Sequence, residues 1–428
     1  MFHKLSKRYL LSICFIAAAL SAGAQAQSID TKSNRENAPY SRFGIGELRN
    51  GMNPVMQAMG GISSAYNNRF TVNGSNPASY ASLLLTTYEG SLVGSSRTIH
   101  SGNDKYKTGM ATINHMNVGI PIGKNGGMSF GYKPVSHIYY KLSDTSVIPD
   151  YGNSVRTFFG DGSLNYAYIG FAGRYKGLSA GFNFGYMFGS TVYADIIESI
   201  DNDQNVNDTR FTKVLKSGGI YWKGGLQYNT KVSENMLLGV GATLALNQDI
   251  KTNVDEFWYS YNYSGGDTTY SLLKQRGTLT MPLMYSFGVQ LSDSNKWMVG
   301  VDLSAANWSN YQAIGRVDSV GDMSYKIAAG GEFTPDATAL RKYFSRVTYR
   351  LGFYYGQDYL YLRNTPMNYY AVTFGFGLPF KRYSDRVNAA FEIGSRGAET
   401  NGLFRESFFK TTIGITLNDR WFIKRQYD

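Results

Sequence analysis

Three kinds of residue in this sequence could carry catalysis or hold a metal. Residues 127–131 read GMSFG and match the G-x-S-x-G pattern around a serine nucleophile. That chemistry needs a turn from a strand into a helix, whereas here the motif follows a turn and opens a strand-like run. Beyond the N-terminal leader the histidines are His100, His115 and His137, and none is spaced with a second ligand as metal sites require. We therefore expect no catalytic residue, no metal and no cofactor.

An acidic stretch from Asp201 to Asn205 resembles the start of a calcium-binding loop. The sixth position is Val206 rather than glycine, and the twelfth is Thr212 rather than glutamate, so the ligand pattern is incomplete. A solvated loop is the simpler interpretation. The alternative is a weak divalent site that bridges lipopolysaccharide.

Charged residues of both signs interrupt runs in which every second residue is apolar. If each run is a strand, one face carries Glu89, Lys133, Lys223, Asp302, Lys326, Glu332, Arg346, Arg350, Glu392 and Lys410. Charges removed from water must be paired, so a structural network is the first interpretation. In the alternative, Arg350 binds the anionic head of an amphiphile, because arginine holds a carboxylate through two hydrogen bonds.

The alternation is the main signal for secondary structure. In residues 178–188 large apolar side chains alternate with mostly small or polar ones, and residues 346–355 and 369–378 repeat the pattern. Successive side chains of a strand point to opposite faces, so each run separates two different environments. The runs are about 10 to 16 residues long, enough for a tilted strand to cross a bilayer. A β-sandwich would have shorter strands and more uniformly charged outer faces.

Fourteen such runs follow one another along the chain. They cover residues 84–98, 108–122, 127–141, 163–174, 177–193, 217–231, 235–251, 276–292, 295–309, 322–334, 345–357, 367–381, 385–398 and 405–418. The sequence therefore predicts an all-β fold: a transmembrane antiparallel β-barrel of about 14 strands.

The connections between the runs alternate in length. Short turns contrast with longer polar segments at 142–162, 194–216, 252–275 and 310–321. Bacterial barrels have short periplasmic turns and long external loops. We therefore expect a multi-pass barrel of the cell outer membrane with both termini in the periplasm.

One of the predicted periplasmic connections differs from the other turns. Residues 334–343 have the pattern of a short helix, with Thr334 as its N-cap and Pro335 at its first position.

The first 26 residues are predicted to be a secretion leader. Basic residues precede an apolar stretch at 10–20, and Ala24 and Ala26 suit cleavage. The single cysteine, Cys14, lies in this leader, so the mature chain has no thiol chemistry. The mature chain has no apolar run long enough for a transmembrane helix. The net charge is +11, with three of the positive charges in the leader, and no basic run suggests nucleic-acid binding.

The residues between leader and barrel carry a family resemblance. Residues 58–65 (AMGGISSA), followed by Asn76, Pro77 and Ala78, resemble the N-terminal signature of FadL-type transporters of hydrophobic compounds. That resemblance implies a fourteen-stranded barrel whose N-terminal segment forms a hatch in the lumen. It also marks Asn76, Pro77 and Ala78 as residues of a ligand pathway.

The resulting domain boundaries are a leader at 1–26, a hatch at 27–82, a barrel at 83–419 and a periplasmic tail at 420–428. Three pieces of the last hundred residues, YRLGFYYG, TFGFGLP and IGITLNDRWFIKR, resemble a group of uncharacterised Bacteroidota barrels.

Pro134 is a further candidate, for a lateral exit. Proline cannot donate a ladder hydrogen bond, so the predicted third strand should be irregular there. FadL-type proteins have a lateral opening at a kink in their third strand, and Pro134 falls in the corresponding strand. The simpler alternative is a harmless bulge, since Pro282 shows that another strand tolerates proline.

Three functions remain open at this point. The first is binding or passive transport of a hydrophobic or amphipathic small molecule, with outer-membrane lipids and lipopolysaccharide as surroundings. The second is a subunit of an outer-membrane secretion or assembly complex with protein partners. The third is a barrel hydrolase, for which His100 near an external loop is the candidate residue.

Overall fold

The computed structural model describes residues 37–149, 151–201, 207–262, 265–293, 296–312, 318–339, 341–380 and 384–421. The predicted leader, most of the calcium-like stretch after Asp201 and most of the predicted tail lie outside these residues. No helix within the described stretches is long and apolar enough to span a membrane.

Strands dominate the fold, and the few helices are short. The elements before the barrel are η1 (Pro39–Arg42), β1 (Glu47–Leu48), α2 (Pro54–Gln57) and η2 (Pro77–Ser82). The others are β2 (Thr86–Ser101), β3 (Asp104–Ile122), β4 (Gly126–Ile148), β5 (Gly152–Tyr175), β6 (Leu178–Ser199), β7 (Asp208–Lys231), β8 (Met236–Ala245), β9 (Gln248–Asn262), β10 (Gly265–Met281), β11 (Leu283–Asp293), β12 (Trp297–Asn307), β13 (Met323–Phe333), α3 (Tyr343–Arg346), β14 (Thr348–Leu362), β15 (Thr365–Pro379), β16 (Arg386–Gly397) and β17 (Arg405–Asp419).

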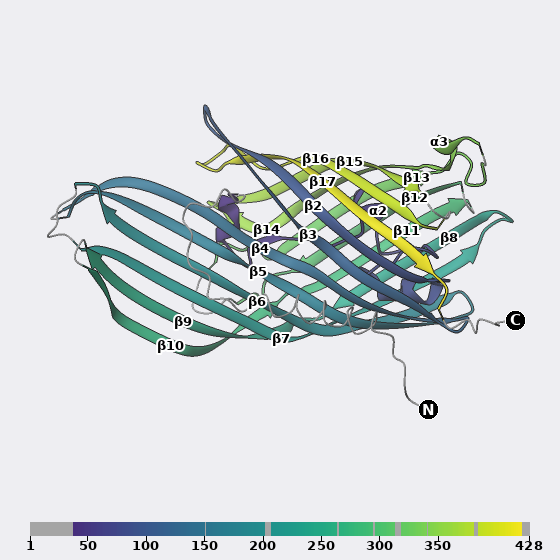
Figure 1. Cartoon of the computed structure of the whole chain (residues 1–428), viewed down its shortest axis with the longest axis horizontal. Helices are drawn as coiled ribbons and strands as arrows, with labels where there is room; N and C mark the ends of the chain where they lie inside the picture. The colour runs from purple at the N-terminus through teal and green to yellow at the C-terminus, as the bar shows by residue number, and fades with distance from the viewer. Residues whose placement is uncertain are drawn as a thin grey trace, which may run out of the picture. The chain divides into compact units, whose positions relative to one another are not determined.

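The strands close into an antiparallel barrel of 14 strands, which confirms the predicted fold class (Figure 1). The ring closes where β17 pairs with β2, with Asp419 opposite Thr86. β8 and β9 share one position in the ring because both pair with β7. β10 and β11 share the next position and are separated by Pro282, which has no N–H for the ladder. Closure matters because lipid cannot satisfy unpaired backbone groups.

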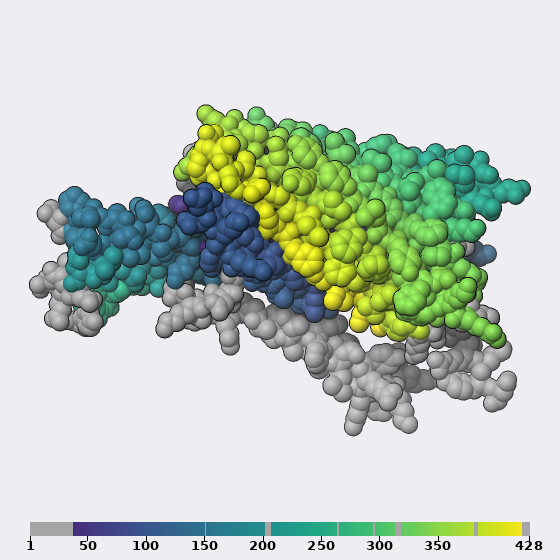
Figure 2. Space-filling model, turned by 90° about the horizontal axis from the view of Figure 1, so that it is seen from above, coloured from purple at the N-terminus to yellow at the C-terminus, as the bar shows by residue number. Residues whose placement is uncertain are grey.

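Six strands extend far beyond the rest at one end of the barrel (Figure 1). β5 and β7 have 24 residues each, whereas β12 and β13 have 11 each. We call the extension of β4, β5, β6, β7, β9 and β10 the wall, and the end that carries it the wall end. The opposite end, with connections such as 123–125, is the short-turn end. Figure 2 shows the wall, in blue and teal, projecting beyond the green and yellow strands.

The wall corrects the prediction of long loops at 142–162, 194–216 and 252–275. Most residues of these segments are strand; for example, β6 and β7 pair without a break from Leu178 and Tyr228 to Ile197 and Thr209. Beyond the membrane both faces of a strand can carry polar side chains, so the alternation fades while backbone pairing continues. The abundant threonine, tyrosine and valine there was the remaining sign of strand structure.

The helix predicted over 334–343 is also wrong. The Thr334 hydroxyl lies 2.8 Å from the Thr348 hydroxyl instead of capping a helix. The Asp336 carboxylate accepts the Thr338 N–H at 2.9 Å, which makes a turn. The helix that forms, α3, ends at Arg346, so this residue lies in a connection and not on the predicted lumen face of a strand.

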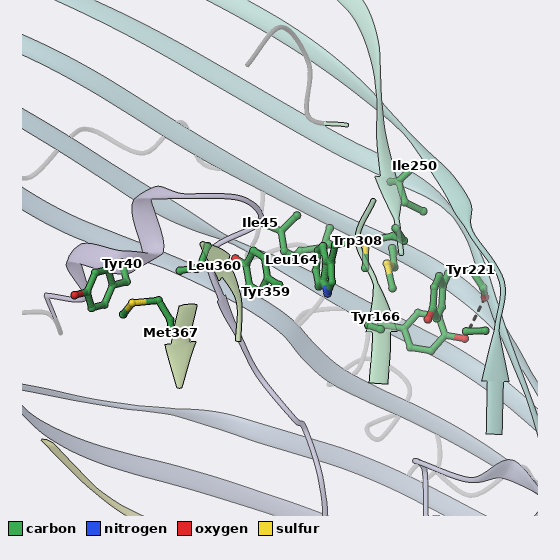
Figure 3. Packing of buried hydrophobic residues seen from close by; sticks show 14 of the residues in the cluster. Tyr40, Ile45, Leu164, Tyr166, Tyr221, Ile250, Trp308, Tyr359, Leu360 and Met367 are labelled. Atoms are coloured by element: carbon green, nitrogen blue, oxygen red, sulfur yellow. Dashed lines mark hydrogen bonds between the residues drawn. The ribbon is translucent and has the colours of Figure 1, made fainter. Parts of the chain in front are cut away.

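The described part of the N-terminal segment, residues 37–85, packs against the inner side of the barrel. One apolar cluster joins Tyr40 and Ile45 to strand residues, and within it the Trp308 ring stacks on Tyr359 at 4.3 Å between centroids (Figure 3). A second cluster joins Met56 and Met59 of this segment to residues of β12 to β15. Both clusters thus join the segment to residues of the barrel strands.

Glycines on the lumen side let this segment approach the strands. A Cβ at Gly330 would lie 2.4 Å from the carbonyl oxygen of Met59, and one at Gly352 would lie 2.2 Å from the Gly60 nitrogen. These distances leave no room for a side chain. The small residues of the alternating runs therefore set the distance between the N-terminal segment and the barrel strands.

Replacement of Gly352 by valine should displace the segment while leaving the strands paired. Overpacking of this kind costs about 1–3 kcal/mol or more, because Met59 and Gly60 contact the strand through backbone atoms. The measurement is the guanidinium midpoint of the purified barrel together with proteolysis within residues 50–60. Valine at Gly90, where a Cβ meets no atom within 4 Å, is the matched control. Equal behaviour of the two variants would contradict the close packing.

Candidate functional site

The backbone pairing between neighbouring barrel strands is interrupted between β3 and β4. Their pairing runs from Ile122 and Gly126 only as far as Met116 and Tyr132. Beyond that point β3 still pairs with β2, and β4 still pairs with β5 up to Ile148. We call this unpaired region the seam. Pro134 lies two residues beyond the last pair, and a register shift follows it between Pro134 and Ser136.

The N-terminal segment pairs with β4 where β3 does not. Residues of β1 take the place of a neighbouring strand, with Glu47 opposite His137 and Leu48 opposite Ser136. Arg49 continues the contact by donating its N–H to the Val135 carbonyl at 2.8 Å. Backbone groups of β4 that would otherwise face the seam are thereby satisfied.

The start of the described chain bridges both sides of the seam. The Asn37 side chain exchanges two hydrogen bonds with the backbone of Lys141, at 3.0 and 3.2 Å. The backbone N–H of Asn37 donates to the Thr108 hydroxyl on β3 at 2.9 Å. Thr108 lies near the tip of the β2–β3 hairpin, so Asn37 is at the wall end. Asp419 lies at the short-turn end. The two ends of the described chain therefore lie at opposite ends of the barrel.

The two residues of β1 have opposite environments. Leu48 is 41% exposed, close to the exposure of Ile113 (44%) on β3. Glu47 is buried and forms an ion pair with Arg97 on β2. The seam therefore presents an apolar residue on one side and a buried carboxylate on the other.

Glu47, on β1, belongs to a buried ion network that includes residues of four barrel strands, β2, β14, β16 and β17. The Arg97 guanidinium also pairs with Glu406 on β17 at 2.9 Å. Arg396 on β16 pairs with Asp358 on β14 at 2.6 Å and lies 3.8 Å from Glu406. Burying such charges is costly unless each is paired, so the network ties β1 to the barrel and fixes its register.

The cavities next to these groups are small, and each contains charged side chains. The cavity of about 140 Å³ beside the network is lined by Glu47, Arg97 and Arg396 among others. A second one, about 50 Å³, lies at the seam and is lined by Arg49, Pro134 and Lys410. A third, about 210 Å³, lies toward the short-turn end.

Arg350 lines the third cavity but already has partners. Its guanidinium pairs with Glu332 at 2.9 Å and donates to the Asn388 side chain at 3.2 Å. Arg350 therefore lies on the lumen side, as its place in the alternation predicts. Because the Arg350 guanidinium is already paired, it is not a free cation of the kind that would bind the anionic head of an amphiphile.

Asn76, Pro77 and Ala78 lie elsewhere again, at the start of η2. The Asn76 side chain accepts the Ala78 N–H at 3.1 Å and donates to the carbonyls of Ser64 at 2.6 Å and Leu226 at 3.2 Å. Pro77 fits against Gly181, where a Cβ would lie 2.4 Å from its carbonyl carbon. These contacts fasten the segment to β6 and β7. The structure does not bring Arg350 or the Asn76 group to the seam.

A buried serine, histidine and glutamate form a cluster that the sequence analysis missed. The Ser91 hydroxyl lies 2.6 Å from Nδ1 of His115, and Nε2 of His115 lies 3.8 Å from Glu89. Ser91 and His115 are register partners across β2 and β3, and Asn114 is the extra residue of a bulge there. All three side chains are buried, and none of the three cavities above touches them. Asn114, which donates to the Ser91 hydroxyl at 3.0 Å, lies between this cluster and the cavity at the seam.

The other motifs have no catalytic or metal-binding geometry. Ser129 of the G-x-S-x-G match lies within β4, not at a turn into a helix. His100 contacts the Ser407 hydroxyl at 3.4 Å. Within the described residues no three His, Cys, Asp or Glu side chains are grouped to hold a metal.

A family model described as BamG matches residues 5–428, which is nearly the whole chain. The chain belongs to the BamG family. No curated protein matches it.

Solved structures with a similar fold include transporters. They include the toluene transporter TbuX of Ralstonia pickettii, with a TM-score of 0.55, 13% identity, and coverage of 86% of this chain and 99% of the transporter. The toluene transporter TodX of Pseudomonas putida gives 0.55, 16%, 88% and 98% in the same order. A Pseudomonas aeruginosa FadL homologue gives 0.54, 9%, 85% and 97%. At these identities the similarity shows that the BamG-family chain shares their fold.

The ion network gives a direct test of how β1 is held. Replacing Arg97 by methionine leaves Glu47 and Glu406 buried with fewer counter-charges, which costs about 3–5 kcal/mol. We expect a matching fall in the free energy of unfolding and faster tryptic cleavage after Arg49. The double variant E47Q/R97M should regain part of the loss. An R97M protein with unchanged stability and cleavage would remove the network from the account of the seam.

Proposed function

We propose that the chain is a non-transport subunit of an outer-membrane protein complex. In this proposal the barrel is a filled scaffold anchored in the membrane, and the wall is the surface that contacts other subunits. The wall end faces outside the cell, in keeping with the usual place of the longer segments of bacterial barrels.

The observation that carries this proposal is the chemistry of the lumen. Pockets for small-molecule ligands are about 300–1,000 Å³ and mostly apolar. Of the cavities described above, the largest is about 210 Å³ and contains Glu332, Arg350 and Arg386. A larger hollow, about 490 Å³, lies on the wall at Trp258 and Tyr270, outside the barrel lumen. The cavities behind the seam contain further ion pairs. A hydrophobic molecule on this route would contact buried charges, which disfavours passage.

The wall supports the same proposal from the outside. One row of register partners crosses the strands of the wall on the side continuous with the lumen. It contains four aromatic residues and one acid: Phe158, Asp195, Phe211, Trp258 and Tyr270. Trp258 and Tyr270 are 45% and 55% exposed. Exposed aromatic residues are enriched in protein interfaces, and passive transport gives no reason for them so far from the lipid.

Cross-linking from the wall tests the complex. With a photoreactive residue in place of Tyr270, gentle extraction should yield one defined adduct, and native mass spectrometry should give an assembly of fixed composition. The same residue at Leu303, on the lipid face of β12, is the control. A cysteine at Thr268 should react with an impermeant reagent in intact cells, and one at Lys124 should not. A chain that is extracted alone, with no adduct from either position, would contradict the proposal.

The seam favours lateral passage of a hydrophobic or amphipathic molecule as a second candidate function. Lipid-facing Met116 marks the end of β3–β4 pairing, and the cavity at Pro134 is lined both by Leu48 of β1 and by the exposed Ile113 of β3. Movement of β1 would connect lipid and lumen without breaking a barrel strand pair.

A disulfide across β1 and β4 separates the two functions. Leu48 and Ser136 lie directly opposite each other, at a spacing that suits L48C/S136C. If molecules pass through the seam, uptake of a hydrophobic dye into proteoliposomes should fall at least tenfold on oxidation and return on reduction. L48C alone is the control. Uptake that is absent, or insensitive to oxidation, would exclude passage by this route and leave the subunit proposal.

A further inference from the structure

Three cations share the outward face of the wall close to its base. Lys216 on β7, Asn253 on β9 and Arg276 on β10 lie in one row of register partners. Lys251 lies in the next row, opposite Gly218 and Thr278. Side chains two residues apart on a strand point to the same face, so Lys216, Lys251 and Arg276 project together. We call them the basic triplet.

The triplet lies where the lipid-facing surface ends. On the same face, Ile220 is 57% exposed and lies one row below Gly218, opposite Tyr186. The Tyr186 hydroxyl reaches up to Gly218, where a Cβ would lie 2.5 Å from it. Tyrosine with its hydroxyl directed toward the water marks the interface belt of a membrane barrel. The triplet is therefore at the level of lipid headgroups.

The charges of the triplet are incompletely neutralised. Lys216 pairs with Asp255 at 3.3 Å, but its side chain is 63% exposed. Asp255 also accepts the Lys274 N–H at 2.8 Å; this bond, together with Lys216, keeps the pKa of Asp255 below its usual value. Asp249, next to Lys251 on the same face, accepts a hydrogen bond from Thr280 at 2.7 Å. Across the described residues no ion pair joins Lys251 or Arg276 to an acid.

Like charges on neighbouring strands repel each other. Lys251 is two residues from the partner of Arg276, and Lys274 adds a fourth positive charge nearby. An anion between Lys251 and Arg276 would remove this repulsion, and a phosphate suits both side chains because arginine binds it bidentately and lysine binds it as a point charge. The apolar surface at Ile220 directly below suits an acyl chain.

We propose that Lys216, Lys251 and Arg276 bind the phosphate of a phosphorylated glycolipid of the outer leaflet, whose acyl chains lie on Ile220 and Tyr186. A lipid fits better than a free anion because one molecule then satisfies the cations and covers the apolar surface beneath them. The site lies on the outer face, so it holds for a complex subunit and for a transporter. The outer leaflet follows from the proposed orientation of the wall end.

Native mass spectrometry of the full chain in a neutral detergent tests the site. The probe is lipid A with two phosphates, compared with the same lipid after removal of both. The wild-type chain should bind the phosphorylated lipid at least tenfold more tightly. K251Q/R276Q should lose most of this preference. K105Q/K107Q, which removes two exposed cations near the tip of the β2–β3 hairpin, should keep it.

Three results would overturn the proposal. The two double variants could lose the preference equally, which would indicate general charge attraction. K251Q/R276Q could bind like the wild type. Inorganic phosphate alone could displace the lipid completely at millimolar concentration, which would indicate a site for a free anion. The substituted residues are exposed, so folding is checked by the thermal band shift of the barrel. Thr268 labelling tests the orientation separately, so its failure would change the leaflet and not the phosphate site.

Discussion

The backbone of β4 beyond Tyr132 sets the central constraint on this structure. Its N–H and C=O groups face a seam in a barrel that lies in lipid, where an unpaired backbone group costs several kcal/mol. β3 has turned away, and residues 37–49 supply the partners. Because β1 must hold this position, Glu47 must be buried, and because Glu47 is buried, Arg97 and Glu406 must accompany it. The buried ion network beside β1 thus follows from the interrupted pairing of β3 with β4.

The glycines and the ion network serve the same constraint in different ways. Gly330 and Gly352 let the segment approach the strands closely enough for apolar packing around Met59. The ion network fixes the register of β1 against β4, which non-directional apolar packing alone would not do. Asn76 fastens the far part of the segment through carbonyls of Ser64 and Leu226.

Much of the barrel could be predicted from the sequence, because lipid and lumen impose opposite requirements on alternate residues. The fourteen strand positions and the inward place of Arg350 follow from that period. The wall could not be found in this way, since water on both faces removes the period at residues such as Thr209 and Ser260. The helix at Thr334 was predicted wrongly because Asp336 makes a turn that competes with a cap.

The candidate site was less accessible to sequence reasoning. Pro134 indicated an irregular strand, and the structure adds that pairing with β3 ends beside it. The contacts around the seam could not be predicted from the sequence, because the contacting residues are far apart in the chain. Asn37 and Lys141 are 104 residues apart, and Arg97 and Glu406 are 309 apart. Ser91 and His115 meet only through the register of β2 and β3. Such contacts require the strand pairing to be known in advance.

The path of the N-terminal segment has a consequence for biogenesis. The chain meets the barrel at Asn37, at the wall end, and leaves the lumen at Thr86, at the short-turn end. It therefore runs the length of a ring that closes when β17 zips onto β2. Threading a closed ring with a segment whose backbone packs this closely against the strands would be difficult, so we expect the nascent sheet to curl around the segment before its last strand docks. The segment would then act as a template for the barrel, because the topology requires it to be in place before β17 pairs with β2.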